Sequence, residues 1–135
     1  MEKIVVMTIK PKHLHDMRTG RKDIELRKTM PQLVDFPFNV ALCESGSGGK
    51  ILAEFICDEA YNICPNYDAY MLAVYAQRAC VRLDEMLEYM NGNSIYGLHV
   101  FDFIDYTRAK GHKVKHINDY GLSRPPQSWC YAKEG

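Results

Sequence analysis

Short runs of apolar residues alternate with polar breaks along most of the chain, which indicates strands rather than long helices. Residues 4–9 are rich in β-branched side chains, and 50–58 and 94–106 alternate apolar with polar positions. Three shorter segments, 22–28, 40–43 and 127–131, have the same character. The pattern therefore predicts five to six short strands.

Two parts of the chain have helical spacing instead. Pro11 suits the first turn of a helix and Gly20 suits its end, so a short helix is expected after the first strand. Residues 68–91 carry apolar side chains three and four apart, with a break near 80–82, so two short helices are expected after the fourth strand. This order predicts an α+β fold, a small and mostly antiparallel β-barrel with inserted helices, in a single domain over 1–135.

Composition sets broad limits on location and chemistry. The chain is 47% hydrophobic and 25% charged, and it has no apolar run of the roughly 20 residues that a membrane span needs. The first residues lack a signal-peptide pattern, and five cysteines without C-x-x-C spacing suit a reducing compartment. We therefore expect a cytoplasmic protein with no membrane partner.

A metal or cofactor is not expected. His112 and His116 are four residues apart, but Gly111 and the alternating Lys113 and Lys115 indicate a loop rather than a helix.

Charge is balanced overall but unevenly distributed. Residues 1–35 hold 8 Lys and Arg against 5 Asp and Glu, residues 36–107 hold 3 against 10, and residues 108–135 hold 6 against 2. If the two ends of the chain meet in the fold, they would form one basic face, which suits an anionic ligand such as nucleic acid. A scattered, solvated distribution of charge explains the same counts.

The segment 22–28 is the most unusual strand. Glu25 and Arg27 share one face of it, and Ile24 and Leu26 share the other. A charged strand face is either solvated or part of a site, and alternation alone leaves both open. A regular strand from residue 22 would also put Lys22 opposite Glu25, unless Lys22 belongs to the preceding turn or to a bulge.

Several motifs in this order resemble the ASCH domain family. They are Thr8-Ile9-Lys10-Pro11, Gly20-Arg21-Lys22-Asp23-Ile24-Glu25-Leu26-Arg27-Lys28, Cys43-Glu44-Ser45, Gly49-Lys50-Ile51 with Ala53-Glu54-Phe55, and Arg124-Pro125-Pro126-Gln127-Ser128-Trp129. The resemblance covers nearly the whole chain. It implies a PUA-like β-barrel with a basic cleft beside the first helix, and a role in binding RNA, other single-stranded nucleic acid or a nucleotide, in transcription or RNA metabolism.

The resemblance also implies which residues form this cleft. They are Lys10, Lys22, Glu25, Arg27 and Lys28, with Glu44 and Ser45 at the rim and Gln127, Ser128 and Trp129 from the last strand. Lysine and arginine there would contact phosphates. Trp129 would either stack on an unpaired base or close the barrel core.

A small hydrolase acting on RNA or on a modified nucleoside is the alternative that the resemblance implies. One group of relatives removes an acyl group from acetylated cytidine with a Lys–Thr pair on this strand; Lys22 matches the lysine, but Glu25 occupies the threonine position. Other relatives are ribonucleases that use a Lys, a Tyr and a Ser, for which Ser128 and either Tyr120 or Tyr131 would be available. If the chain is an enzyme, the catalytic candidates are Lys22, Glu25 as a general base, and Ser128.

Overall fold

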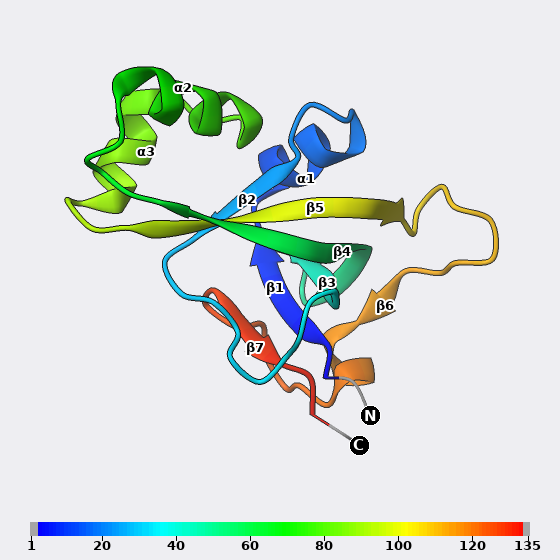
Figure 1. Cartoon of the computed structure of the whole chain (residues 1–135). Coiled ribbons are helices and arrows are strands. Elements are labelled where there is room, and N and C mark those ends of the chain that lie inside the picture. Colours follow the sequence, from blue (N-terminus) through cyan, green and yellow to red (C-terminus); the bar gives the residue numbers. More distant parts are fainter. Residues whose placement is uncertain (1–2, 134–135) are drawn as a thin grey trace.

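The computed structural model describes residues 3–133, which form one curled, mixed β-sheet with three α-helices (Figure 1). The elements in chain order are β1 (Val5–Ile9), α1 (Pro11–Arg18), β2 (Ile24–Arg27), β3 (Phe38–Glu44), β4 (Lys50–Ile63), α2 (Ala69–Arg78), α3 (Leu83–Met90), β5 (Ile95–Asp105), β6 (Lys115–His116), a 3₁₀ helix (Ile117–Tyr120) and β7 (Trp129–Tyr131). The expected α+β class is confirmed.

The sheet is a half-barrel with two unpaired edges. Its strands lie in the order β2-β5-β4-β3-β1-β7, and β6 pairs with β4 outside this path. β1 and β3 are parallel, while the other pairs are antiparallel. Because β7 pairs with β1, the two ends of the chain do meet. β2 and β7, far apart in the strand order, form the two edges.

Side chains join these two edges where no backbone ladder does. Trp129 on β7 donates its indole N–H to the Thr29 hydroxyl at 3.0 Å, just after β2. The Tyr131 hydroxyl accepts the backbone N–H groups of Gln32 and Leu33 at 2.8 and 2.9 Å. Trp129 therefore helps to close the barrel, one of the two roles considered for it.

Local sequence signals explain where the helices begin and end. Pro11 occupies the first turn of α1, where a missing N–H costs nothing, and the chain leaves the helix through Gly20 at a φ of +77°. Asp68 caps α2 by accepting the N–H of Met71 at 2.8 Å. α3 ends at Asn91, whose φ of +49° lies in the left-handed region.

The apolar side chains form separate cores. The main core lies inside the curl and includes Phe55, Leu42 and Leu14, the last from α1. A second core lies behind β1 and the 3₁₀ helix. A third is made by α2, α3 and the ends of β4 and β5, and includes Leu72 and Met86. The helix pair α2–α3 thus rests on a core of its own.

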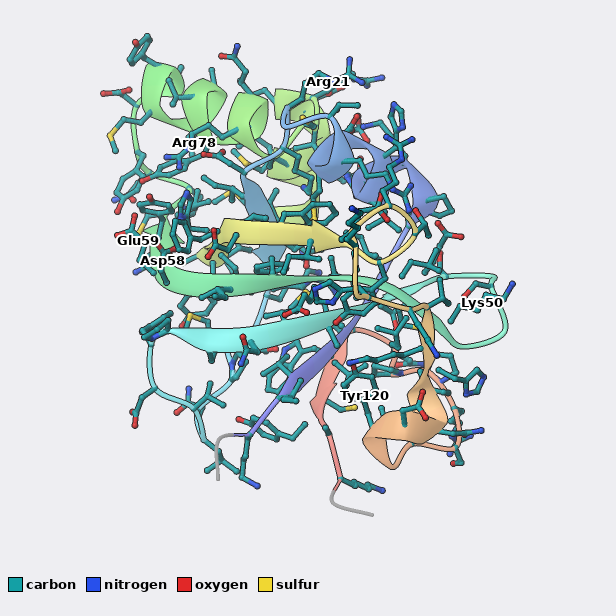
Figure 2. The ribbon with its side chains drawn as sticks, turned by 90° about the vertical axis from the view of Figure 1, so that its right-hand side faces the viewer. Arg21, Lys50, Asp58, Glu59, Arg78 and Tyr120 are labelled. Carbon is teal, nitrogen blue, oxygen red and sulfur yellow. The ribbon has the colours of Figure 1, made fainter. Side chains whose placement is uncertain are left out.

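Polar contacts fix α2 to the neighbouring strands. Arg78 donates to both carboxylate oxygens of Asp23 at 3.1 and 3.0 Å, and its guanidinium lies 5.0 Å from the ring centroid of Tyr61. His99 Nδ1 is 2.6 Å from the carboxylate of Asp58. Arg78 and Asp58 gather at one end of the sheet below α2 (Figure 2). The contacts of Arg78 hold the helix pair beside β2, whereas the His99–Asp58 pair joins β5 to β4.

Two details of the strands differ from simple alternation. A bulge was expected near Asp102, and the β4–β5 register shifts there while Asp102 adopts a φ of +50°. The sheet has seven strands instead of five to six, because the two-residue β6 lies within a segment that reads as a loop.

The five cysteines are all free, and burial raises the pKa of Cys57 to about 12, so its thiol packs as a small apolar group. No three His, Cys, Asp or Glu side chains within residues 3–133 are grouped so that they could hold a metal ion. His112 stacks on Tyr106, and the His116 ring accepts the N–H of Asn118. Among the helices of this part of the chain, none is both long and apolar enough to span a membrane.

Gly97→Ala should destabilise the protein. A Cβ at this buried position of β5 would lie 2.8 Å from Ile24 Cγ2 and 3.1 Å from Ile63 Cδ1, between β2 and the third core. We expect the free energy of unfolding to fall by about 1–3 kcal/mol, as is usual for overpacking. Urea unfolding measures this, with the exposed Ser94→Ala as the control from the same strand region. Equal midpoints for the two variants would contradict the predicted crowding.

Candidate functional site

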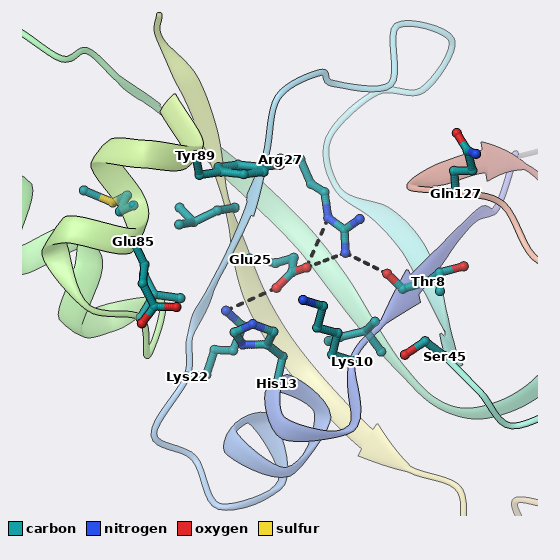
Figure 3. A pocket seen from close by; sticks show the side chains of 14 residues that line it. Thr8, Lys10, His13, Lys22, Glu25, Arg27, Ser45, Glu85, Tyr89 and Gln127 are labelled. Carbon is teal, nitrogen blue, oxygen red and sulfur yellow. Dashed lines mark hydrogen bonds and ion pairs between the residues drawn. The ribbon is translucent and has the colours of Figure 1, made fainter. Parts of the chain in front are cut away.

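A pocket of about 440 Å³ opens between the end of β1, the start of α1, β2 and α3 (Figure 3). α1 contributes His13, β2 contributes Glu25 and Arg27, and α3 contributes Tyr89. Loops on either side add polar groups at the rim. The pocket therefore combines segments from both ends and the middle of the chain.

The floor of the pocket is a buried charged triad. Glu25 forms an ion pair with Lys22, whose Nζ lies 3.2 Å from Oε1. It accepts hydrogen bonds from the guanidinium of Arg27, whose Nε is 3.1 Å from Oε2 and whose Nη2 forms a shorter contact. Lys22, Glu25 and Arg27 are only 3%, 5% and 8% exposed. Charges this deeply buried must be paired, and here one carboxylate lies between two cations.

All five donors of Arg27 are used within the protein. Besides Glu25, Nη2 donates to the carbonyl of Thr8 at 2.9 Å, and Nη1 lies 3.2 and 3.1 Å from the carbonyl and hydroxyl oxygens of Ser128. Thr8 belongs to β1 and Ser128 precedes β7. Arg27 therefore joins the two edges of the sheet, as Trp129 does, and keeps no N–H for a ligand.

Lys22 reaches Glu25 because it lies outside the strand. β2 begins only at Ile24, and the backbone N–H groups of Arg21 and Lys22 both donate to the carbonyl of Asp16, which turns the chain before β2. From this turn Lys22 Nζ donates to the carbonyl of Ala79 at 2.6 Å and forms an ion pair with Glu25. Even if the ion pair uses a second of its three N–H donors, one remains.

Glu25 is held in its ionised form. Burial alone raises the pKa of a carboxyl group, but the charges of Lys22 and Arg27 and the hydrogen bond from Arg27 outweigh burial and lower the pKa of Glu25. The three recorded contacts leave acceptor capacity on its oxygens, because a carboxylate has about four lone-pair positions.

His13 stands next to this triad on the first turn of α1 (Figure 3). Its Nδ1 is buried and has no hydrogen-bond partner among residues 3–133. Burial, followed by the charge of Lys22, lowers its pKa, so the imidazole is neutral near pH 7. The side chain is partly exposed and lines the pocket.

The walls above the floor are amphipathic. Ile9, Leu26, Val81 and Met86 provide apolar surface, and Tyr89 provides an aromatic ring. At the rim are Lys10, Ser45, Glu85 and Gln127. Three cations against two carboxylates give the lining a net charge of +1, so it is only mildly basic.

Six of the ten residues that the sequence predicted for the cleft line this pocket: Lys10, Lys22, Glu25, Arg27, Ser45 and Gln127. The other four lie outside its lining, within the part of the chain that the structure describes. Lys28 Nζ lies 4.8 Å from the ring centroid of Tyr89, and the Glu44 carbonyl accepts the Ser47 hydroxyl. Ser128 contacts Arg27, and Trp129 contacts Thr29.

Three other lining residues, His13, Glu85 and Tyr89, were not predicted from the sequence. Tyr89 and Glu85 are on α3, and the spacing of that helix indicated only a packed face. His13 lies two residues after Pro11 in the first turn of α1, close in sequence to the predicted Lys10, and this position is the signal that could have indicated it.

Comparison with solved structures identifies the fold. Neither a protein-family profile nor a curated protein sequence matches the chain. A crystal structure of ASCH from Zymomonas mobilis has a TM-score of 0.72 and 14% identity, and the match covers 98% of this chain and 89% of that one. A variant of that protein with serine replaced by alanine has a TM-score of 0.70 and 14% identity, and the match covers 98% of this chain and 90% of that one. A second variant, with tyrosine replaced by phenylalanine, has a TM-score of 0.70 and 15% identity, and the match covers 98% of this chain and 92% of that one. The chain has the fold of these ASCH structures, as its motifs predicted.

Arg27→Met should destabilise the protein strongly. The substitution keeps much of the side-chain volume but removes a cation from the buried carboxylate and the hydrogen bonds that Arg27 donates to the Thr8 and Ser128 carbonyls, of which the Ser128 carbonyl keeps the Thr8 N–H. Breaking one side of a buried ion pair costs about 3–5 kcal/mol. Urea unfolding measures the loss, and the exposed Lys10→Met serves as the control, expected within about 0.5 kcal/mol of wild type. A wild-type midpoint for Arg27→Met would refute the role of Arg27 in closing the sheet.

Glu25→Gln should change how stability depends on pH. A carboxyl group whose folded-state pKa is lowered stabilises the native state above its unfolded pKa of about 4.3, and this contribution disappears as the pH falls through the folded-state value. Glutamine does not titrate. The stability difference between wild type and Glu25→Gln should therefore be largest near neutral pH and shrink below about pH 4, which urea unfolding at several pH values measures. A difference that grows on acidification would contradict an ionised Glu25.

Proposed function

We propose that this protein binds single-stranded RNA or a free nucleotide by seating one nucleotide unit in the pocket. The observation that carries the proposal is the buried Lys22–Glu25–Arg27 triad at the floor of a pocket whose walls are apolar and aromatic. Small-molecule sites combine such walls with a few fixed polar groups, and about 440 Å³ is within their usual range.

The polar floor suits the edge of a nucleobase. Glu25 keeps acceptor capacity and Lys22 keeps one N–H, so a carboxylate acceptor and an ammonium donor lie 3.2 Å apart. Nucleobases present neighbouring donors and acceptors along their edges, and unpaired bases of single-stranded RNA are read there. Arg27 fixes the Glu25 carboxylate and the Ala79 carbonyl fixes the Lys22 ammonium, so these two side chains need little reorganisation when a ligand binds.

The rest of the nucleotide has partners nearer the rim. The ring of Tyr89 offers a surface on which a base can stack. Lys10 is exposed and has no ion-pair partner among residues 3–133, so its ammonium is available to a phosphate. α1 starts directly after Lys10 without a side-chain cap or an acidic residue in its first turn, which adds to the positive potential there.

The alternative of a small hydrolase receives less support. A general base that works at neutral pH needs a pKa near that pH, whereas the pKa of Glu25 is lowered. The Ser128 hydroxyl contacts Arg27 and lies outside the lining, and Glu25, which has no hydroxyl, occupies the place of the threonine that acyl-removing relatives carry. The triad is thus better suited to holding a ligand than to attacking one.

Tyr89→Leu should weaken nucleotide binding while the fold is kept. Loss of a stacking surface costs about 1–3 kcal/mol per base. Calorimetric titration with nucleoside monophosphates, and fluorescence anisotropy with a short single-stranded RNA, measure the change. Tyr70→Leu is the matched control, because Tyr70 is 79% exposed on α2 and lies outside the pocket.

Wild-type protein that binds neither ligand would refute the proposed function. So would equal losses for Tyr89→Leu and Tyr70→Leu, because the pocket would then not be the place of binding. The RNA recovered after each titration is also checked for length, and shortened RNA would support the hydrolase instead.

A further inference from the structure

We infer that a second, basic surface beside the pocket binds the phosphodiester backbone of the RNA strand that leaves it. This inference rests on the proposed function and extends it from one nucleotide to a strand. The surface, here named the basic loop surface, consists of Lys50, Arg108, Lys110, Lys113 and Lys115.

The basic loop surface is unusually free of negative charge. Residues 106–116 contain no carboxylate, and all five of its cations are exposed. Four of them, all but Arg108, make no ion pair with another residue in 3–133; Arg108 lies 3.8 Å from Asp105, which Arg18 already binds at 2.7 Å. These charges are thus available to a polyanion, whereas both cations of the triad in the pocket are paired with Glu25.

Packing holds the loop in place although it is exposed. The His112 ring stacks on Tyr106 at 5.4 Å with an interplanar angle of 4°, and Lys115 Nζ lies 5.4 Å from the same ring. Tyr106 is itself buried and donates to Glu54 at 2.9 Å. β6 ends the loop by pairing with Lys50 and Ile51. A pre-positioned set of charges loses less conformational entropy on binding than a flexible one.

A short segment links this surface to the pocket rim. Ser45 lines the pocket, and the turn from Ser45 to Gly49 leads directly to Lys50, which pairs with His116 of β6. Five residues span at most about 18 Å. The other end of the loop is held beside α1 by the pair between Arg18 and Asp105. The loop projects from the right-hand side of Figure 1, and Figure 2 faces this side, with Lys50 at the start of β4, directly after the hairpin turn.

The chemistry favours a phosphodiester backbone as the ligand. The cations are spread along a loop and a hairpin instead of converging on one point, which suits a line of separate phosphates. Such contacts give affinity without base preference, and each one neutralised adds about 0.7 to the slope of log affinity against log salt for a single strand. The pocket would then select a base while this surface holds the flanking strand.

The test compares two ligands and two matched variants. Lys110→Gln with Lys113→Gln removes two charges from the surface, and Lys3→Gln with Lys133→Gln removes two exposed charges at the β1–β7 end. Affinities for a nucleoside monophosphate and for a single-stranded RNA of about ten nucleotides are measured over a range of salt concentrations. The surface variant should bind the RNA about tenfold more weakly at about 0.1 M salt and lose about 1.4 from the salt slope, with unchanged affinity for the monophosphate.

The outcomes separate the two proposals. If RNA affinity and salt slope change equally in the surface variant and in the control, the role of the basic loop surface is overturned. That result would not contradict nucleotide binding in the pocket. Normal RNA binding by Tyr89→Leu, with loss in the surface variant, would refute the pocket and support the surface. An acidic peptide of equal charge that displaces the RNA more readily than RNA itself would assign the surface to a protein partner and overturn the inference.

Discussion

The contact between Glu25 and Arg27 lies at the place where the two edges of the sheet meet. β2 is hydrogen-bonded to β5 along one side only, and on its free side it faces β1 and β7 without a backbone ladder. Arg27 extends across this gap to Thr8 and Ser128, and Glu25 supplies the negative charge that allows a guanidinium to be buried there. Closure of the barrel and the charge at the floor of the pocket therefore depend on one another.

This dependence separates residues that maintain the pocket from residues that remain open to a ligand. Arg27 has the charge expected of a phosphate-binding residue, but its donors are all committed within the protein. Lys22 and Glu25 each keep capacity on the side of the pocket, and Lys10 is free at the rim. Binding residues chosen for their charge alone would thus include Arg27, whose role is structural. Loss of Arg27 would lower the stability of the fold more than it would change ligand binding directly.

Much of this arrangement could be predicted from the sequence, and the remainder shows the limit of such reasoning. Helix ends at Pro11 and Gly20 and the bulge at Asp102 follow from local chemistry, and the structure has them. Lys22 lies next to Glu25 because of the point at which the turn before β2 ends. The two-residue alternation of side chains along a strand does not predict that point. The positions of Ser128 and Trp129 at the seam follow from the closure of the sheet, and Tyr89 reaches the pocket only because the α2–α3 pair packs beside β2. These are tertiary effects, and neither composition nor spacing encodes them locally.

The link between Arg27 and Ser128 joins residues 101 positions apart in the chain. During synthesis on the ribosome, strand β2 is complete long before its partner at the other edge has been made. At about 5–20 residues per second, the interval between the two is on the order of 5–20 seconds, during which Glu25 and Arg27 remain in contact with water. All residues that line the pocket except Gln127 are made by residue 89, but the seam that Arg27 holds at the floor of the pocket is completed only when residue 128 joins the fold.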